Sequence, residues 1–304
     1  MDTAQLEAIA REARVQIERM LTHAGSGHPG GANSVIDILV ALYFGRLRVD
    51  PKNPAWPDRD RVILSKGHAV PALYAVMARK GFFPESQLIT LRKLGSPLQG
   101  HPDRNALPGI EAATGSLGQG LSIAEGEALG LKMAGSQARV YCVMGDGEIQ
   151  EGQVWEAAMT GPKLGQPQHP LDNLVAILDY NKIQLDGFVS DILDLEPVVD
   201  KWKSFGWAVQ EIDGHNFAQI EKALDQAEAT KGRPSFIVAN TVKGKGVSWM
   251  ENNPEWHGKA PKPQEAIKAI GELLGVSDAA WDEYLTRDSA TRAVVDELAA
   301  LDKK

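Results

Sequence analysis

The sequence is short of cysteine, of long apolar runs and of positive charge. It has one cysteine, Cys142, among 304 residues, which excludes an intrachain disulfide and favours a reducing compartment. No uninterrupted apolar stretch approaches membrane-spanning length, and the charged N-terminal stretch is unlike a signal peptide. The net charge of −8 gives no basic footprint for nucleic acid. We therefore expect a cytoplasmic protein with neither a membrane nor a nucleic-acid partner, while a few basic side chains could still hold a phosphorylated small molecule.

The apolar runs that are present are compact, rich in β-branched residues and free of strict alternation. Such runs suit parallel strands that are covered on both faces. Segments with helical spacing lie between them, so we predict an α/β fold, a doubly wound, mostly parallel sheet with helices on both faces. Ligands of such sheets bind beyond the carboxyl ends of the strands. The predicted strands are RVILS (61–65), RVYCVM (139–144), LVAILDY (174–180) and FIVANT (236–241).

The two ends of the chain have helical patterns. Residues 4–22 carry apolar side chains at helical spacing, which predicts an amphipathic opening helix. After about residue 260 only helical patterns remain, and they follow a proline-rich piece. We expect a ligand-binding domain over residues 1–262 and a C-terminal helical extension over residues 263–304.

One carboxylate stands between two glycines where a predicted buried strand ends. Gly-Asp-Gly (145–147) follows RVYCVM, and Asn181 follows LVAILDY. Two neighbouring parallel strands would bring Asp146 and Asn181 together, and with a backbone carbonyl they would offer hard oxygen ligands for Mg²⁺ or Ca²⁺ beside phosphate oxygens. The flanking glycines let the backbone approach an anion closely. Taken alone, the tripeptide could equally be a turn in which Asp146 caps the next helix.

This constellation resembles the thiamine-diphosphate motif, in which Gly-Asp-Gly is followed downstream by Asn. The surrounding residues resemble transketolase, in particular the N-terminal subunit of split transketolases, from roughly residue 10 to residue 262. The resemblance implies the thiamine-diphosphate-binding fold of the diphosphate-binding type. It is carried by SGHPGG, LSKGHAVPALY, GHPD, TGSLGQGLSIAEG, GDGEIQEGQVWEAA, DYNKIQLDG, DGHN, TVKGKG and WHGKAP.

The resemblance implies a set of metal and cofactor residues. Asp146, Asn181 and the backbone carbonyl of Ile183 would hold Mg²⁺ or Ca²⁺, and the metal would bridge the two phosphates of thiamine diphosphate. The cofactor would also contact His68, Gly115, Leu117 and Gly147.

Three more histidines and one glutamate match positions near the reacting atoms. By resemblance, His28, His101 and His257 would line the funnel to the cofactor, hydrogen-bond sugar hydroxyls and shuttle protons near neutral pH. Glu151 resembles an acidic residue that is buried at a subunit interface near the cofactor. The alternative for Glu151 is a carboxylate favoured by a helix N-terminus.

The other basic motif residues are less clearly assigned. His23 and His169 match no motif and are expected at the surface, while His215, in DGHN, is expected to be structural. Lys243 and Lys245, in TVKGKG, could neutralise phosphate or could be solvated loop charges, and the sequence does not separate these alternatives.

The activity implied by the resemblance is transfer of a two-carbon ketol unit from a ketose phosphate to an aldose phosphate, as in the pentose phosphate pathway. In full-length transketolases a second α/β domain supplies the acid that acts on the pyrimidine ring and the arginines that bind the substrate phosphate. We expect a C-terminal transketolase subunit to supply them here, in a heterotetramer, and the chain alone to be inactive. The preferred sugars are not fixed by the sequence.

Other functions remain as alternatives. A deoxyxylulose-phosphate synthase-like or 2-oxoacid dehydrogenase-like subunit would share the cofactor. A nicotinamide-dependent dehydrogenase would share the fold, but GSLGQG has the wrong glycine spacing. A non-catalytic subunit that kept only the fold would have no need of Asp146, Asn181 and the motif histidines.

The sequence departs from the family pattern in one place. Asp146 and Asn181 are 35 positions apart, several more than the family usually shows. We expect the extra residues to form a longer surface loop over 161–173, which contains three prolines. Whether this loop alters contacts near the site is left open by the sequence.

Overall fold

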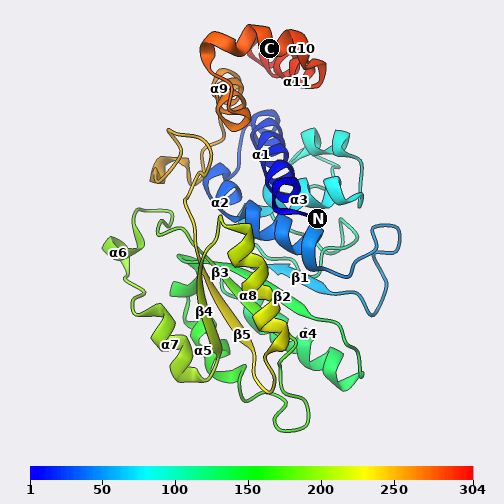
Figure 1. Ribbon diagram of the computed structural model, residues 1–304, viewed down its shortest axis with the longest axis vertical. Coiled ribbons are helices and arrows are strands. Elements are labelled where there is room, and N and C mark those ends of the chain that lie inside the picture. The colour runs from blue at the N-terminus through cyan, green and yellow to red at the C-terminus, as the bar shows by residue number, and fades with distance from the viewer. Residues whose placement is uncertain (304) are drawn as a thin grey trace.

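The computed structural model describes residues 1–303, and a five-stranded sheet lies at its centre (Figure 1). Every neighbouring pair of strands is parallel, and the order is β1-β2-β3-β5-β4. The predicted α/β class is therefore confirmed. The strands are β1 (Arg61–Leu64), β2 (Val140–Gly145), β3 (Leu174–Tyr180), β4 (Ala208–Asp213) and β5 (Ser235–Asn240).

The helices begin and end where local sequence signals place them. The opening helix starts after Asp2, whose side chain forms a capping box with Gln5, and it ends at Gly25, which has φ 63°. Proline occupies the first turn of the second and third helices, where no intrahelical N–H is needed. The helices are α1 (Thr3–Ala24), α2 (Pro29–Val40), α3 (Val70–Lys80), α4 (Gly120–Met133), α5 (Gly152–Thr160), α6 (Val189–Ile192), α7 (Val198–Phe205), α8 (Phe217–Ala229), α9 (Pro263–Leu274), α10 (Trp281–Arg287) and α11 (Ser289–Ala299).

Two hydrophobic cores cover the two faces of the sheet. Alternate residues of β2 enter different cores, because successive side chains of a strand point to opposite faces. Tyr141 and Val143 pack with residues of α1, α2, α3 and α8. Cys142 and Met144 pack with residues of α4, α5 and α7. This double burial explains why β1, β2, β3 and β5 were recognisable as unbroken apolar runs.

The fifth strand was not predicted. β4 has the sequence AVQEID, and its residues are half-buried or exposed because it lies at the edge of the sheet beside β5. Its polar side chains hide the apolar pattern on which strand prediction depends.

The C-terminal helices pack against the N-terminal one. Figure 1 shows α9, α10 and α11 at the end of the molecule beyond α1, away from the strands. Val15 of α1 packs in the small apolar clusters formed with α9 and α11. The first of these helices begins at Pro263, where the helical extension was expected, and the division into two domains stays a prediction.

Two histidines were expected at the surface, and for His23 that prediction is wrong. Its side chain is only 8% exposed, and its Nε2 lies 2.5 Å from Oε1 of Glu297. The contact ties α1 to α11. His169 is half-buried, in the segment that joins α5 to β3.

That segment, residues 161–173, runs past the amino ends of the strands. It leaves α5 at Thr160 and enters β3 at Leu174. Gln166 Nε2 donates a hydrogen bond to the carbonyl of Gly232, which precedes β5, at 2.7 Å. The lengthened loop therefore lies at the sheet edge opposite to the carboxyl ends of the strands.

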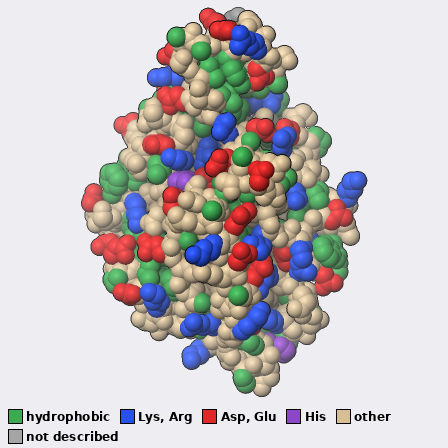
Figure 2. Space-filling model, in the orientation of Figure 1, with side chains coloured by type: hydrophobic (Ala, Val, Ile, Leu, Met, Phe, Trp, Pro, Cys, Tyr) green, Lys and Arg blue, Asp and Glu red, His purple; other side chains and the backbone are tan. Residues whose placement is uncertain are grey.

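The surface carries charges of both signs. On the face shown in Figure 2, Lys and Arg side chains are interspersed with Asp and Glu. Within residues 1–303 we find no helix that combines the length and the apolar character required to span a membrane.

A buried glutamate in α4 is expected to make stability depend on pH. Burial raises the pKa of Glu125 to about 8, and its Oε1 has no hydrogen-bond partner among residues 1–303. The folded state therefore holds a proton that the unfolded chain releases above its ordinary pKa of 4.5. This contribution to stability is complete at low pH and is lost as pH rises toward 8.

The stability of Glu125→Gln relative to the wild type should therefore increase as the pH rises from 5 to 8, because the glutamine has no proton to lose. Urea unfolding across this range measures the difference. The exposed Glu7→Gln is the matched control and should run parallel to the wild type. A constant difference between Glu125→Gln and the wild type would contradict the prediction.

Candidate active site

A cavity of about 510 Å³ opens at the carboxyl edge of the sheet. It is lined by every residue that the sequence analysis singled out for the metal, the cofactor or the substrate funnel. Segments far apart in the chain therefore meet at one place, as expected for a doubly wound sheet. These lining residues are His28, His68, His101, Gly115, Leu117, Asp146, Gly147, Glu151, Asn181, Ile183 and His257.

The predicted metal ligands lie at the ends of β2 and β3, which are adjacent strands. Asp146 accepts hydrogen bonds from the backbone N–H groups of Gly147 (2.7 Å) and Lys182 (2.5 Å), so its carboxylate is held in place. Asn181 Oδ1 accepts from the N–H of Ile183 at 3.1 Å, which fixes the amide.

These residues fit a hard divalent cation. Asp146 and Asn181 are almost fully buried, and both line the cavity with Ile183. They supply one carboxylate, one amide oxygen and one carbonyl, which are oxygen ligands of the kind that Mg²⁺ and Ca²⁺ take. Across residues 1–303, no three His, Cys, Asp or Glu side chains are grouped to hold a metal, so a soft transition-metal centre is not indicated.

The charge of Asp146 is costly where it stands. Burial, followed by repulsion from Asp179, raises the pKa of Asp146 to about 6, although Lys243 and the Gly147 N–H oppose the shift. A cation placed at this carboxylate would remove the repulsion and favour the ionised form.

A buried ion pair beneath the site was not predicted. Lys66, in the SKGH motif, pairs with Asp179 of β3, and both side chains are at most 2% exposed. The hydroxyls of Ser34 and Thr241 also donate to Asp179. Burial would raise the pKa of Asp179, but the charge of Lys66 and these hydrogen bonds outweigh it and hold the pKa below its usual value. The ion pair joins the loop after β1 to β3, and the Thr241 hydroxyl joins the loop after β5 to the same residue.

Glu148 is a second residue that the sequence analysis did not single out. It accepts hydrogen bonds from the N–H groups of Gly118 (2.9 Å) and Gly145 (3.0 Å) and from the Ser65 hydroxyl. The TGSLGQG loop is thereby held against the Gly-Asp-Gly turn. In the sequence, the only sign of a role for Glu148 was its position directly after Gly147.

Gly147 is required by close packing. A Cβ built on it would lie 2.6 Å from the Cβ of Gln184, a distance that real side chains do not reach. The turn after β2 and the loop after β3 can therefore approach each other only with glycine at this position.

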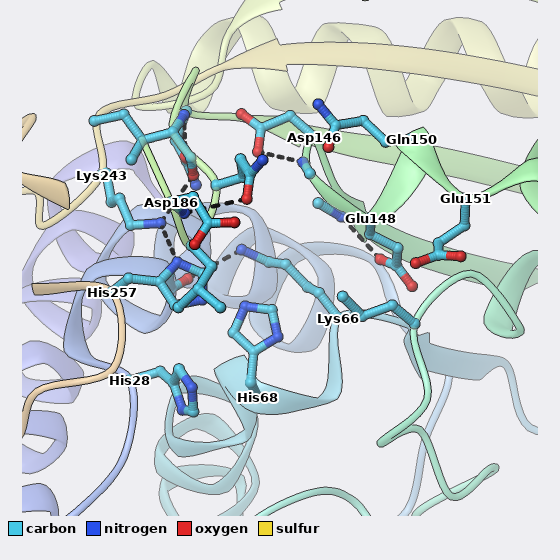
Figure 3. Close-up of a pocket in the computed structure, with 18 of the residues that line it drawn as sticks. His28, Lys66, His68, Asp146, Glu148, Gln150, Glu151, Asp186, Lys243 and His257 are labelled. Atoms are coloured by element: carbon cyan, nitrogen blue, oxygen red, sulfur yellow. Dashed lines mark hydrogen bonds between the residues drawn. The ribbon is translucent and has the colours of Figure 1, made fainter. Parts of the chain in front are cut away.

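Three of the predicted histidines form a cluster. The ring centroids of His28, His68 and His257 are 5.0 to 5.4 Å apart. Figure 3 shows them on one side of the cavity, with Asp146, Glu148 and Glu151 on the other.

Burial is the main cause that lowers the pKa of all three rings. Burial, with the charges of Arg92, His101 and Lys243, lowers the pKa of His28 to about 4, and burial with Lys243 lowers that of His257 to about 3. Burial also lowers the pKa of His68. The proton shuttling and the sugar contacts that the resemblance implies for these histidines stay predictions.

Two further predicted residues that line the cavity, His101 and Glu151, are exposed. His101 lies against Gly115, since a Cβ built on Gly115 would be 3.6 Å from Cγ of the ring. Burial and the charge of Arg92 lower the pKa of His101. Glu151 is exposed at the start of α5, so the interface burial that the resemblance implies stays a prediction about an assembly.

The two lysines of TVKGKG have different environments in the structure. Lys243 is 1% exposed, and its Nζ lies 2.9 Å from the Ile183 carbonyl and 2.8 Å from His257 Nδ1. Lys245 is 39% exposed, and its Nζ lies 3.5 Å from Glu251. Only Lys243 lines the cavity with the predicted residues.

A family model described as the thiamine diphosphate binding domain of transketolase matches residues 6–284. The chain belongs to the transketolase family. The predicted resemblance is confirmed, and membership favours transketolase over the nicotinamide-dehydrogenase alternative. The match also extends beyond residue 262, the expected limit of the resemblance.

Relatives close in length to this transketolase chain are named as single subunits. A 6-deoxy-6-sulfo-D-fructose transketolase subunit of Clostridium sp. (strain MSTE9) is 47% identical, over 82% of this chain and 89% of the relative. An apulose-4-phosphate transketolase subunit of Actinobacillus succinogenes is 41% identical, over 90% of this chain and 96% of the relative.

The chain spans about half the length of the solved transketolases that it matches. Transketolase from Campylobacter jejuni superposes with a TM-score of 0.83 at 33% identity, over 100% of this chain and 48% of that chain. This likeness supports the fold assigned above.

Proposed function

We propose that the chain is the diphosphate- and metal-binding subunit of a two-subunit transketolase. With a C-terminal partner subunit, it transfers a two-carbon ketol unit from a ketose to an aldose. The observation that carries the proposal is the meeting of the oxygen ligands Asp146, Asn181 and Ile183 with Lys243 and the histidine cluster in one cavity. The names of the relatives, which are those of single subunits, support the need for a partner.

Each side of the cavity has its own task in this proposal. Asp146, Asn181 and the Ile183 carbonyl hold Mg²⁺, or Ca²⁺ in its place. Lys243, His68 and the Gly147 backbone hold the diphosphate, because a buried cation attracts an anion and glycine lets the backbone approach it closely. When bound, thiamine diphosphate supplies the carbon nucleophile and accepts the electron pair released by carbon–carbon cleavage.

The histidines and Glu151 face the substrate and the assembly. His28, His101 and His257 orient the sugar through hydrogen bonds to its hydroxyls, since neutral imidazoles can both donate and accept. Glu151 acts across the interface between copies in a heterotetramer, where it would become buried. The single buried thiol, Cys142, suits a cytoplasmic location.

The substrates are sugars with an anionic end group. Two relatives are named for a sulfo-sugar and a sugar phosphate, which share a terminal anion and a polyhydroxy chain. We therefore propose a ketose phosphate or ketose sulfonate as donor and an aldose phosphate as acceptor.

The test is ketol transfer with thiamine diphosphate and Mg²⁺, measured for the chain alone and for the chain mixed with a C-terminal transketolase subunit from the same genome. Xylulose 5-phosphate and 6-deoxy-6-sulfofructose serve as donors in separate arms, with ribose 5-phosphate as acceptor. We expect turnover in the mixture only, in at least one donor arm. Turnover by the chain alone would contradict the need for a partner.

Calorimetric titration of the chain with thiamine diphosphate and Mg²⁺ provides the independent measurement. Metal-dependent binding is expected. Absence of both binding and turnover would favour a non-catalytic role for the chain and would overturn the proposed function.

A further inference from the structure

The turn that carries Lys243 is fixed at three successive points. Thr241 donates its hydroxyl to Asp179 and its N–H to the Tyr180 carbonyl, at 3.1 Å for the latter. The N–H of Gly244 donates to the carbonyl of Gly30 at 3.0 Å. Between them, the N–H of Val242 donates to His215 Nε2 at 2.8 Å.

The last of these bonds fixes the tautomer of His215. A backbone N–H can only donate, so Nε2 must be the unprotonated nitrogen and Nδ1 must carry the proton. Nδ1 lies 2.6 Å from Oδ2 of Asp37 and donates to it. The ring, which belongs to the turn after β4, thus connects Asp37 of α2 to the residue before Lys243.

Asp37 is itself held by an arginine. The two guanidinium nitrogens of Arg14 donate to Oδ1 (3.1 Å) and Oδ2 (2.7 Å) of Asp37. Burial would raise the pKa of Asp37, but the charge of Arg14 and the hydrogen bonds from His215 and Arg14 outweigh it and hold the pKa below its usual value. The Asp37 carboxylate accepts the proton that His215 carries on Nδ1, as carboxylates do for histidines that serve through their other nitrogen.

We infer that His215 is a positioning residue that holds the turn carrying Lys243 at the cavity, beside His257. The inference rests on the proposed function, and it assigns to the DGHN motif a task beyond the structural one expected from the sequence. His215 does not line the 510 Å³ cavity among the described residues, so it acts through the Val242 N–H. Without that acceptor, the half-buried N–H loses its partner and the lysine-bearing turn loses one of its three anchors.

The test is calorimetric binding of thiamine diphosphate, with Mg²⁺, to variants of the full chain. His215→Asn keeps a donor for Asp37 but is too short to accept from Val242, and it should weaken binding about tenfold, as expected for the loss of one hydrogen bond to a half-buried group. His215→Gln reaches further with its amide oxygen and should bind within about threefold of the wild type. Unfolding midpoints check that each variant is folded.

A double-mutant cycle separates positioning from general stability. If His215 acts through Lys243, His215→Asn should change affinity less than about twofold in a Lys243→Met background. In the enzyme assembled with its partner, His215→Asn should raise the apparent KM for thiamine diphosphate, while kcat at saturation stays within about threefold.

Three outcomes would overturn the inference: unchanged binding by His215→Asn, additive losses in the cycle, or failure of every one of His215→Asn, His215→Ser and His215→Ala to fold. The last would show that the residue serves the fold as a whole. Lack of binding by the wild-type chain would instead count against the proposed function, so the two failures are distinguishable.

Discussion

Asp146→Ala is expected to lower ketol transfer by the assembled enzyme by about three orders of magnitude, because the proposed metal site would lose its one carboxylate ligand and, with the metal, its hold on the diphosphate. Asn181 and the Ile183 carbonyl are neutral and cannot replace the missing charge. Steady-state turnover and calorimetric titration with thiamine diphosphate and Mg²⁺ measure the loss.

The same substitution has two opposing effects on the metal-free chain: it removes a carboxylate that is unfavourable there, and it leaves the N–H groups of Gly147 and Lys182 without their acceptor. At pH 7 the ionised carboxylate is unfavourable there, because burial and Asp179 raise its pKa to about 6. The group therefore contributes less stability at pH 7 than at pH 5, where it is protonated in the folded state. Thermal unfolding should show that cofactor and Mg²⁺ at a hundred times Kd stabilise the wild type by about 2.7 kcal/mol and leave Asp146→Ala unchanged.

Asp58→Asn is the control, because it also removes one carboxylate, but from an exposed position away from the cavity. It should keep full turnover and full stabilisation by cofactor and Mg²⁺. Retained metal-dependent stabilisation of Asp146→Ala would place the metal at other ligands and contradict the assignment.

The proximity of Asp146 and Asn181 could be predicted from the sequence, because it follows from the geometry of parallel sheets alone. Neighbouring parallel strands end at the same edge, and the observed register pairs Gly145 with Asp179. Any residue just beyond these strands then lies beside its counterpart. The motifs on the other loops could be placed in the same way, because each follows a strand or opens a helix.

Residues whose role depends on distant partners were not predicted. Lys66 pairs with Asp179, and Glu148 binds the Ser65 hydroxyl, across separations of 113 and 83 residues. His23 was wrongly expected at the surface because its partner, Glu297, is 274 residues away. Nothing in the local pattern of such a residue distinguishes a buried pair from a solvated charge.

The sequence also could not tell which of the two lysines of TVKGKG is buried, although the two residues are close together in the chain. They stand two residues apart in one motif, yet one is buried and one is exposed. Gly244 and Gly246 take left-handed conformations, with φ 75° and 95°, and the turn that they form sends Lys243 inward and Lys245 outward. Only the folded course of this turn decides which lysine can meet an anion.

Lys243→Met is therefore expected to raise the Kd for thiamine diphosphate by about a hundredfold, and Lys245→Met by less than about twofold. The first variant removes a buried cation from the diphosphate side, where a charged hydrogen bond is worth about 1.5–3 kcal/mol. The second removes one partner of an exposed ion pair, which is worth about 0–1 kcal/mol. Calorimetric titration of both variants under identical conditions makes the comparison.

The pH dependence should distinguish loss of charge from loss of packing. Burial is the main cause that lowers the pKa of His257, and the charge of Lys243 is the next. In Lys243→Met that second cause is gone and Nδ1 has lost its donor, so His257 should take up a proton at a higher pH than in the wild type. Nuclear magnetic resonance titration of the imidazole should show this upward shift, while Lys245→Met should leave the titration unchanged. Equal effects of the two substitutions on Kd would contradict the assignment of Lys243 to the diphosphate.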